Sequence, residues 1–307
     1  MAFGKFAASD EMRESLLSIL KDISPNEDNY FVSNLGKGAP ATNTTHEWNL
    51  YYASRPTSVT VKAEGAETSY SDLTAETRSS NVTTILDRPV KLSRTRKSIA
   101  MVTGEDALSV EKERALRMLK SDMEWITING AYAAGSSGTG RSIAGIDACI
   151  STNVTARASG QSFTETELND IVQESYNQVG YDYIMNMLVA PPIIKRRVAQ
   201  FGTNVTRNIN ASEKRLTSEV RVYDSELGPA VMVIAHKDVR ATAGTLTSYG
   251  LNDDMFEYSF LINSGEPHWE DRAASGDYVP GTYITEFTLV SYQQRACVKR
   301  TGYATTM

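Results

Sequence analysis

Apolar residues recur at helical spacing in two parts of the first half of the chain. Near the amino end, a predicted helix stops before Pro25 and has one apolar face, formed by Met12, Leu16, Ile19, Leu20 and Ile23. A stronger pattern runs from about residue 103 to residue 134, with a capping box at its start and an apolar stripe formed by Leu108, Ala115, Leu119, Met123 and Ile126. At 1.5 Å per residue, this second helix would be roughly 45 Å long. We expect it to be the spine of the fold.

The segment between these helices, residues 53–98, has a strand pattern but few apolar residues. Only 13 of its 46 residues are apolar, whereas the whole chain is 41% apolar. Val59 and Val61 alternate with polar residues, and after a turn-like EGAETSYSD the residues from Val82 to Leu92 predict a returning strand. A long two-stranded arm of this composition is marginal in water by itself. We therefore expect a neighbouring molecule to hold it.

Helices and strands alternate in the second half, after a glycine-rich break at residues 135–140. A helix is predicted over residues 164–179, with Thr164 as its cap, followed by an apolar strand and the short basic helix IIKRRVAQF. Residues 220–223 and 230–235 should pair as strands. This order predicts a compact α/β domain. Two further strands, Tyr283–Val290 and Arg295–Tyr303, are expected to pack on the spine helix.

Composition and charge narrow the class of protein. A net charge of −6 argues against a dedicated nucleic-acid binder, which would have a basic domain. The basic clusters at residues 91–97 and 195–197 are interpreted as solvated or salt-bridged faces, with weak phosphate contacts as the alternative. No segment approaches the ~20 apolar residues of a membrane span. Two cysteines without a secretory signal favour a reducing cytosol over a disulfide framework.

One motif suggests nucleotide chemistry. GSSGTGRS at residues 135–142 has the spacing of a phosphate loop, with Arg141 in the place of the lysine. Such a loop requires a strand before it and a helix after it, and here a helix is predicted before it. We therefore favour Gly135 as the residue that ends the spine helix over a nucleotide site.

Other catalytic or metal chemistry is not supported. The three histidines lie far apart at positions 46, 236 and 268, without metal-ligand spacing. A Cys–His pair that uses Cys149 or Cys297 is less favoured than two buried structural cysteines. We predict no catalytic centre, no metal site and no cofactor.

Sequence motifs along most of the chain resemble one family. The run ISPNEDNYFVSNLGKGAPATNTTHEWN at Ile23–Asn49 resembles the amino-terminal arm motif of tailed-bacteriophage major capsid proteins with the Hong Kong 97-type fold. The similarity continues in order through AEGAET, LKSDMEWITINGAYAAG, GRSIAGI, YIMNMLVAPP and ITEFTLVS. The chain departs from the family pattern at Asp28-Asn29, where the family has Thr-Pro, at Asn49, where it has Gln, and in an extra Asn-Met before Leu188. These departures change details of the arm only.

The resemblance implies an α+β fold with an amino-terminal arm, an extended β-hairpin called the E-loop, a peripheral domain with a long spine helix, and an α/β axial domain. The arm would be residues 1–52 and the E-loop residues 53–98. Residues 99–144 would form the peripheral domain with the spine helix, residues 145–260 the axial domain, and residues 261–307 a return to the peripheral domain.

The same resemblance implies a structural protein that assembles into pentamers and hexamers of an icosahedral head shell around double-stranded phage DNA. The protein would be part of the virion, assembled in the host cytoplasm, with no membrane partner. Because the predicted arm helix begins within about ten residues of Met1, we expect a separate scaffolding protein. Portal and decoration proteins are further expected partners. An encapsulin-type nanocompartment shell protein is the alternative with the same fold, and a phosphate-loop enzyme is the third.

We expect the E-loop to lie across the adjacent subunit. Its carboxylates would meet Arg or Lys side chains there, and each exposed ion pair contributes at most ~1 kcal/mol. The candidate inter-subunit contacts are Glu64, Glu67, Tyr70, Asp72, Glu76, Trp48, Arg94, Arg96 and Lys97.

Overall fold

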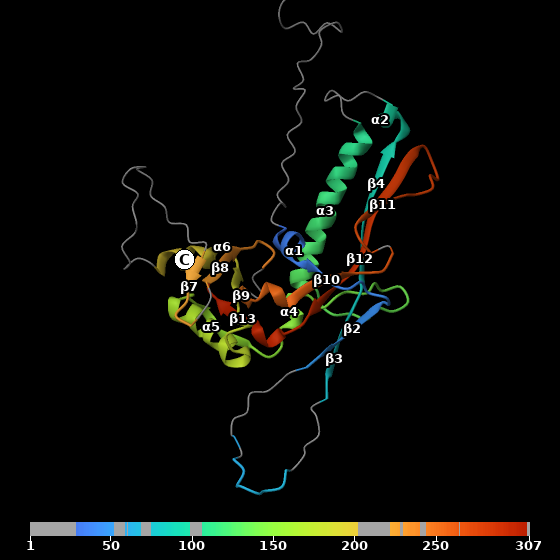
Figure 1. Cartoon of the computed structure of the whole chain (residues 1–307). Helices are drawn as coiled ribbons and strands as arrows, with labels where there is room; N and C mark the ends of the chain where they lie inside the picture. The colour runs from blue at the N-terminus through green and yellow to red at the C-terminus, as the bar shows by residue number, and fades with distance from the viewer. Residues whose placement is uncertain are drawn as a thin grey trace, which may run out of the picture.

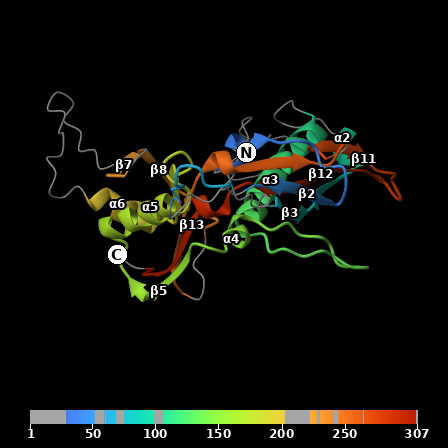
Figure 2. The ribbon, with the colours of Figure 1, turned by 60° about the horizontal axis from the view of Figure 1, so that its bottom comes forward.

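The computed structural model describes residues 29–51, 59, 61–68, 75–98, 106–201, 222–227, 230–239, 244–263 and 265–305. The amphipathic helix predicted near the amino end lies outside these residues. Two sheets and one long helix make up most of the described chain, and Figure 2 shows them as two lobes. The α-helices are α1 (Tyr30–Asn34), α2 (Arg94–Ser98), α3 (Ala107–Asn129), α4 (Ile146–Cys149), α5 (Glu165–Val179) and α6 (Pro192–Phe201).

Thirteen strands are described, and they form sheets of five, six and two strands. In chain order they are β1 (Gly36–Lys37), β2 (Thr45–Leu50), β3 (Thr77–Val82), β4 (Thr84–Ser93), β5 (Val154–Gln161), β6 (Met187–Ala190), β7 (Val222–Asp224), β8 (Ala230–Ala235), β9 (Leu246–Leu251), β10 (Phe256–Phe260), β11 (His268–Asp271), β12 (Tyr278–Ser291) and β13 (Val298–Tyr303). Helix and strand are thus both prominent, as the α+β prediction requires.

The spine helix is α3. The Asp106 carboxylate caps it by accepting the Ser109 N–H at 3.1 Å. The predicted stripe is buried at Ala115, Leu119, Met123 and Ile126, while Leu108 is half-buried.

The predicted end of the spine helix is wrong. The helix stops at Asn129, so its 23 residues span about 35 Å. The backbone leaves the helical conformation at Gly130, with φ −59° and ψ 127°. Only glycine fits there, because a Cβ would lie 2.5 Å from the Ile126 carbonyl oxygen and 2.8 Å from that of Ile143. Gly135, the predicted helix end, lies beyond it in a loop with φ +76°.

The five-stranded sheet is built on β12, the longest strand. β4 pairs antiparallel with β12 from Tyr278 to Phe287, and β10 and β11 also pair with it antiparallel. β1 adds parallel to β10. Figure 1 shows α3 running along β4, β11 and β12. A bidentate ion pair joins the two layers, from the Arg88 guanidinium of β4 to the Asp122 carboxylate of α3.

The pairing within the polar segment differs from the prediction. Residues 82–92 were expected to return alongside residues 59–62, but β4 pairs with β12, and β3 pairs with β2. The reason is burial: Leu92 of β4 is 3% exposed, and Leu86 packs on the core beside α3. The polar arm is therefore the ribbon β2–β3. It is joined at its tip by a segment whose described residues, 59 and 61–68, form no strand.

The six-stranded sheet has the order β5-β13-β9-β6-β8-β7. The predicted helices α5 and α6 are confirmed and bury apolar side chains against it. The Thr164 hydroxyl oxygen accepts the Glu167 N–H at 3.3 Å, which confirms the predicted cap. The predicted pairing with residues 230–235 is confirmed for Val222 and Tyr223, as β7 with β8, while residues 220 and 221 lie outside the described part of the chain.

Two strands lie in a different sheet from the one their position in the sequence indicated. β13 was expected on the spine helix but pairs with β5 and β9, because Val298 and Tyr303 are buried in the core of the six-stranded sheet. β10 lies in the segment predicted as axial but pairs with β12. The two sheets share one core, since Val189 and Tyr249 of the six-stranded sheet cluster with Phe256 and Phe287 of the five-stranded sheet.

A buried carboxylate joins three distant segments beside this shared core. Glu124 of α3 accepts the backbone N–H groups of Phe31 and Val32 in α1, at 2.9 and 2.8 Å. Its other partner is Nε2 of His236, just after β8, at 2.9 Å, and both side chains are 1% exposed. Because Nδ1 of His236 accepts the Asp238 N–H at 3.2 Å, we assign the ring proton to Nε2.

Substituting Gly281 should destabilise the five-stranded sheet. A Cβ at Gly281 would lie 2.0 Å from the ring of Trp269, which stacks edge-on against Tyr283 and carries the Lys112 ammonium over its face. We expect Gly281→Ala to lower the free energy of unfolding by ~1–3 kcal/mol, measured by urea denaturation of the unassembled chain. Gly140→Ala is the matched control, because no heavy atom lies within 4 Å of its Cβ position. Equal urea midpoints for the two variants would contradict this packing.

Substituting Glu124 should release α1. In Glu124→Gln the side-chain NH2 group must face one of the three donors that the carboxylate now accepts, so we expect a loss of about 2–4 kcal/mol in unfolding free energy. Hydrogen exchange of the Phe31 and Val32 amides should accelerate. The control is Glu113→Gln on the exposed side of the same helix, where loss of a pair with Arg117 costs about 0.5 kcal/mol. Unchanged amide protection in Glu124→Gln would rule out the capping role.

Candidate assembly surface

The tip of the polar arm extends away from both sheets, at the lower end of Figure 1. Its described part turns at Glu64-Gly65, where Ala66 N–H donates to Ala63 O at 3.1 Å and Gly65 has φ +80°, as a type II turn requires. Val59 is 80% and Val61 88% exposed. No ion pair to the carboxylates of Glu64 and Glu67 occurs among the residues that the structure describes. The tip thus presents two valines and two carboxylates to water, together with Lys62, whose ammonium donates to the Glu67 carbonyl oxygen at 3.3 Å.

The base of the ribbon is fixed to the body by Asn81. Its Nδ2 donates to the carbonyl oxygens of Ala144 and Leu289, at 3.1 and 2.8 Å, while its Oδ1 accepts the Ala144 N–H at 2.9 Å. This residue was missed in the sequence, where a buried asparagine in a polar strand has no distinguishing pattern. Trp48 of β2, predicted as an inter-subunit contact, donates its indole N–H to Ser291 O at 3.2 Å and is half-buried. Its polar group therefore bonds within its own chain.

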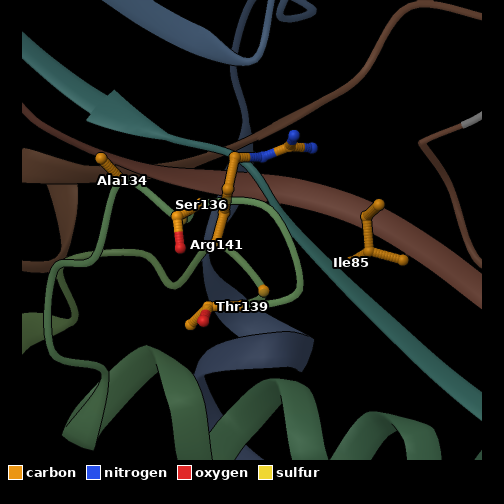
Figure 3. A pocket seen from close by; sticks show the side chains of 7 residues that line it. Ile85, Ala134, Ser136, Thr139 and Arg141 are labelled. Carbon is orange, nitrogen blue, oxygen red and sulfur yellow. The ribbon is translucent and has the colours of Figure 1, made fainter.

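The glycine-rich loop that resembles a phosphate loop is a second anchor for the ribbon. Arg141 donates to Glu286 of β12 at 2.8 Å and to the Thr83 carbonyl oxygen at 3.2 Å. The Thr83 hydroxyl donates to the same Glu286 oxygen at 2.7 Å. Figure 3 shows Arg141 extending from the loop past β4, with Ser136 and Thr139 across a hollow of about 370 Å³ from Ile85. The loop follows α3 and precedes the four-residue α4, so it lacks the strand and long helix of a phosphate loop.

The predicted basic contacts lie at the opposite end of the molecule from the tip. Arg94 pairs with Asp277 at 3.7 Å and Arg96 with Glu111 at 3.6 Å, and both arginine side chains are more than half exposed. Lys97 is exposed beside Asp106, whose pKa is lowered chiefly by hydrogen bonds from Ser109 and in part by Lys97. Figure 1 shows α2 at the top of the molecule and the tip at the bottom. One copy therefore does not bring these basic residues to its own acidic tip.

The remaining predicted contacts are placed only in part. Glu76 is exposed just before β3, and Glu64 and Glu67 are exposed at the tip. Tyr70 and Asp72 lie outside the described residues. The structure thus groups Glu64 and Glu67 at the tip, and Arg94, Arg96 and Lys97 on α2.

The two cysteines and His236 lie outside this surface. Burial raises the pKa of both Cys149 and Cys297 to about 12, so both are neutral thiols at pH 7. His236 is bound to Glu124. No cluster of three or more His, Cys, Asp or Glu side chains suited to a metal ion is found in the part of the chain that the structure describes. No described helix is long and apolar enough to cross a membrane.

Solved structures with the same fold include phage capsids and an encapsulin complex. The chain is similar to the Cyanophage A-1(L) capsid, with a TM-score of 0.69 and 13% identity over 95% of this chain and 97% of that one. It is similar to the capsid of Myoviridae Phage XM1, with a TM-score of 0.59 and 11% identity over 94% and 96%. The holo-SrpI encapsulin of Synechococcus elongatus PCC 7942 matches with a TM-score of 0.62 and 11% identity over 96% and 94%. At these identities the likeness shows the fold, and it confirms the predicted α+β capsid architecture.

Sequence comparison then separates the two kinds of shell. No curated protein matches the chain. A family model described as SU10 major capsid protein matches residues 3–304, nearly the full 307. This match favours the phage capsid over the encapsulin alternative, which shares the fold. The chain belongs to the SU10 major capsid protein family, and it is a bacteriophage head shell protein, a component of the virion that acts in many copies.

Proposed function

We propose that each copy holds its neighbour by laying the tip of its β2–β3 ribbon on the α2 end of the adjacent subunit. The observation that carries this proposal is the separation of complementary charges. Glu64 and Glu67 lie at one end of the molecule and Arg94, Arg96 and Lys97 at the other. The tip carboxylates cannot reach α2 of their own copy. When copies meet head to tail, they add to the weak pairs that Arg94 and Arg96 already make with Asp277 and Glu111.

The exposed valines at the tip add a second attraction. Val59 and Val61 are two residues apart, so in extended chain their side chains point to the same side. Full burial of a valine is worth about 1.5 kcal/mol or more, while an exposed ion pair gives 0–1 kcal/mol. A single tip contact is therefore weak. Repeated around each ring and over the whole shell, such contacts give a stable particle from copies that stay soluble before assembly.

The arrangement of copies into rings and a shell follows from the same proposal. Head-to-tail contacts form closed rings when the rotation per subunit closes, so pentamers and hexamers of an icosahedral shell are the expected units.

The enclosed cargo is double-stranded phage DNA. Scaffolding, portal and decoration proteins are the further partners, with assembly in the host cytoplasm. The predicted division into arm, E-loop, peripheral and axial domains is retained as a proposal, with β4 and β10 moved to the peripheral part and β13 to the axial part, because these strands pair there.

Reversing the tip charges should block assembly without unfolding the chain. We expect Glu64→Lys with Glu67→Lys to lower the yield of shells by at least tenfold, because tip and α2 would then repel each other. The urea midpoint should stay at its wild-type value, since residues 61–68 touch neither sheet. Shells are counted by sedimentation and negative-stain electron microscopy.

The matched control is the complementary reversal on α2, Arg96→Glu with Lys97→Glu. This variant alone should also lose shells, and the four substitutions together should restore them. Wild-type shell yields from the tip variant would refute the contact. Failure of the combined variant to recover would show that the tip binds some surface other than α2.

The encapsulin alternative is tested by the cargo. Particles from infected cells should release double-stranded DNA on heating, measured by nuclease-sensitive dye fluorescence. Particles filled with one abundant enzyme and lacking DNA would instead identify a nanocompartment.

A further inference from the structure

The six-stranded sheet exposes apolar side chains on one of its faces, at β7 and β8. Val222 of β7 and Met232 of β8 lie directly opposite each other in the antiparallel pair, so both side chains are on the same face. Val222 is 52% and Met232 44% exposed. The hydroxyl of Tyr30 in α1 lies 3.9 Å from the Met232 sulfur. We call Tyr30, Val222 and Met232 the Met232 patch. It continues the shared core to the surface, because Met187, the partner of Met232 on β6, is buried in that core.

Aspartates lie around the Met232 patch. Asp224 is exposed and lies two residues after Val222 on β7, which places it on the same face. The pKa of Tyr30 is raised, chiefly by burial and in part by the negative charge of Asp253, so Asp253 lies beside the patch as well. Asp254 follows it and is exposed. None of the three aspartates forms an ion pair with a residue that the structure describes. The patch is therefore apolar at its centre and negative at its edge.

The opposite face of the same sheet is covered by a basic helix. Val231 and Val233 alternate with Met232 along β8, and both are buried in one core with Ile194 and Val198 of α6. Helix α6 thus lies on the face away from the Met232 patch. Figure 2 shows α5 and α6 on one side of this lobe and β7 and β8 on the other.

The outward side of α6 carries two cations. Ile194 and Val198 point to the sheet, and Arg196, two positions from each, lies on the other side of the helix and is exposed. Lys195 beside it is half-buried. Neither cation forms an ion pair within the described part of the chain, and α6 contains no acidic residue. The two faces of this lobe are therefore complementary, with a negative, partly apolar patch on one and a positive helix on the other.

We propose that the Met232 patch of one copy binds the outward side of α6 of the next copy, with Lys195 and Arg196 at the aspartates around the patch. The occupant is a second copy because the two surfaces match in charge, and a single chain cannot bring opposite faces of its own sheet together. Ala199 and the aliphatic stems of the two basic side chains cover Val222 and Met232.

This contact is head to tail, since it joins two different surfaces, and its repetition with a constant rotation closes a ring. It uses none of the residues of the tip contact. It requires only that the protein acts in many copies, so it can hold where the tip contact fails.

Charge exchange tests the contact in the full-length chain. Asp224→Lys with Asp254→Lys should lower the yield of shells at least tenfold, and so should Lys195→Glu with Arg196→Glu, because like charges then meet. The four substitutions together should restore the yield. The urea midpoint of each unassembled variant should stay at the wild-type value, since none of these side chains forms an ion pair with a described residue. Wild-type shell yield from either double variant would overturn the proposal, and failure of the combined variant to recover would exclude α6 as the occupant.

Exchange of partners separates this contact from the tip contact. Glu64→Lys with Glu67→Lys, combined with Lys195→Glu and Arg196→Glu, should remain without shells, because the reversed α6 compensates only for a reversed patch. Recovery of shells in this combination would mean that α6 receives the tip, and it would overturn the patch contact.

An engineered disulfide measures the contact in assembled shells. Met232→Cys with Ala199→Cys places one thiol on each surface, and pairs whose Cα atoms come within about 7 Å will oxidise. The product should join different chains, seen as a ladder of multimers on non-reducing gels. It should form tenfold or more faster than with the matched control, Met232→Cys with Ala274→Cys, whose second thiol lies in the exposed loop between β11 and β12. Equal rates, products within single chains or no disulfide would each overturn the proposal.

Oxidation of Met232 by hydrogen peroxide gives a measurement on the unchanged chain. Sulfoxide formation at Met232 should be several-fold slower in shells than in the unassembled chain, because the neighbouring α6 then covers the thioether. Equal rates in the two states would contradict the contact.

Discussion

The buried carboxylate of Glu124 is the constraint on which the arrangement of the body depends. An ionised carboxylate out of contact with water costs several kcal/mol unless donors surround it. The fold supplies three, from Phe31, Val32 and His236. The donors belong to α1 and to the residue that follows β8, and the carboxylate belongs to α3. None of these segments can shift without leaving a buried polar group without its hydrogen bond, so α3, α1 and the six-stranded sheet keep one relative position.

A body fixed in this way holds the two ends of the molecule, the tip of the ribbon and α2, at a constant distance and orientation. The shared core joins the sheets, and Asn81, Arg141 and Glu286 attach the polar ribbon to it through buried or half-buried hydrogen bonds. A tip contact in one copy is therefore held at a defined position relative to α2 of the same copy. Rings require this property, because the rotation from one subunit to the next must be the same each time for a head-to-tail interface to close.

Local patterns in the sequence predicted local structure well and long-range pairing poorly. The Thr164 cap, α5, α6 and the β7–β8 pair follow from spacing and capping residues within about twenty positions. β4 pairs with residues about 200 positions away, and β13 pairs with β5 and β9, about 145 and 50 positions away. The periodicity of a segment carries no information about such distant partners. The end of α3 was misjudged because glycine is required at Gly130 by the close approach of the Ile143 backbone, which is a neighbour in space and not in the local pattern.

The prediction of the assembly surface was limited in the same way, because burial also depends on residues that are distant in the sequence. The acidic tip and the basic α2 were visible as charges in polar context, whereas Asn81, Glu124 and Arg141 looked like ordinary solvated residues or a nucleotide motif. Their roles arise from burial, which a single sequence does not display. The family was nevertheless recognisable, because the arm and spine motifs persist in order along nearly the whole chain.

The polar composition of the ribbon follows from the need to remain soluble before assembly. A two-stranded ribbon has two free edges, and an apolar one would pair with other chains without control. Here the ribbon carries the exposed pair Arg78–Glu47, and apolar exposure is concentrated at Val59 and Val61 near the tip. Each contact is then too weak to hold two copies in a wrong position, and only the geometry that satisfies every neighbour at once accumulates enough free energy to persist. A more apolar arm would bind its neighbour more tightly and build the shell less accurately.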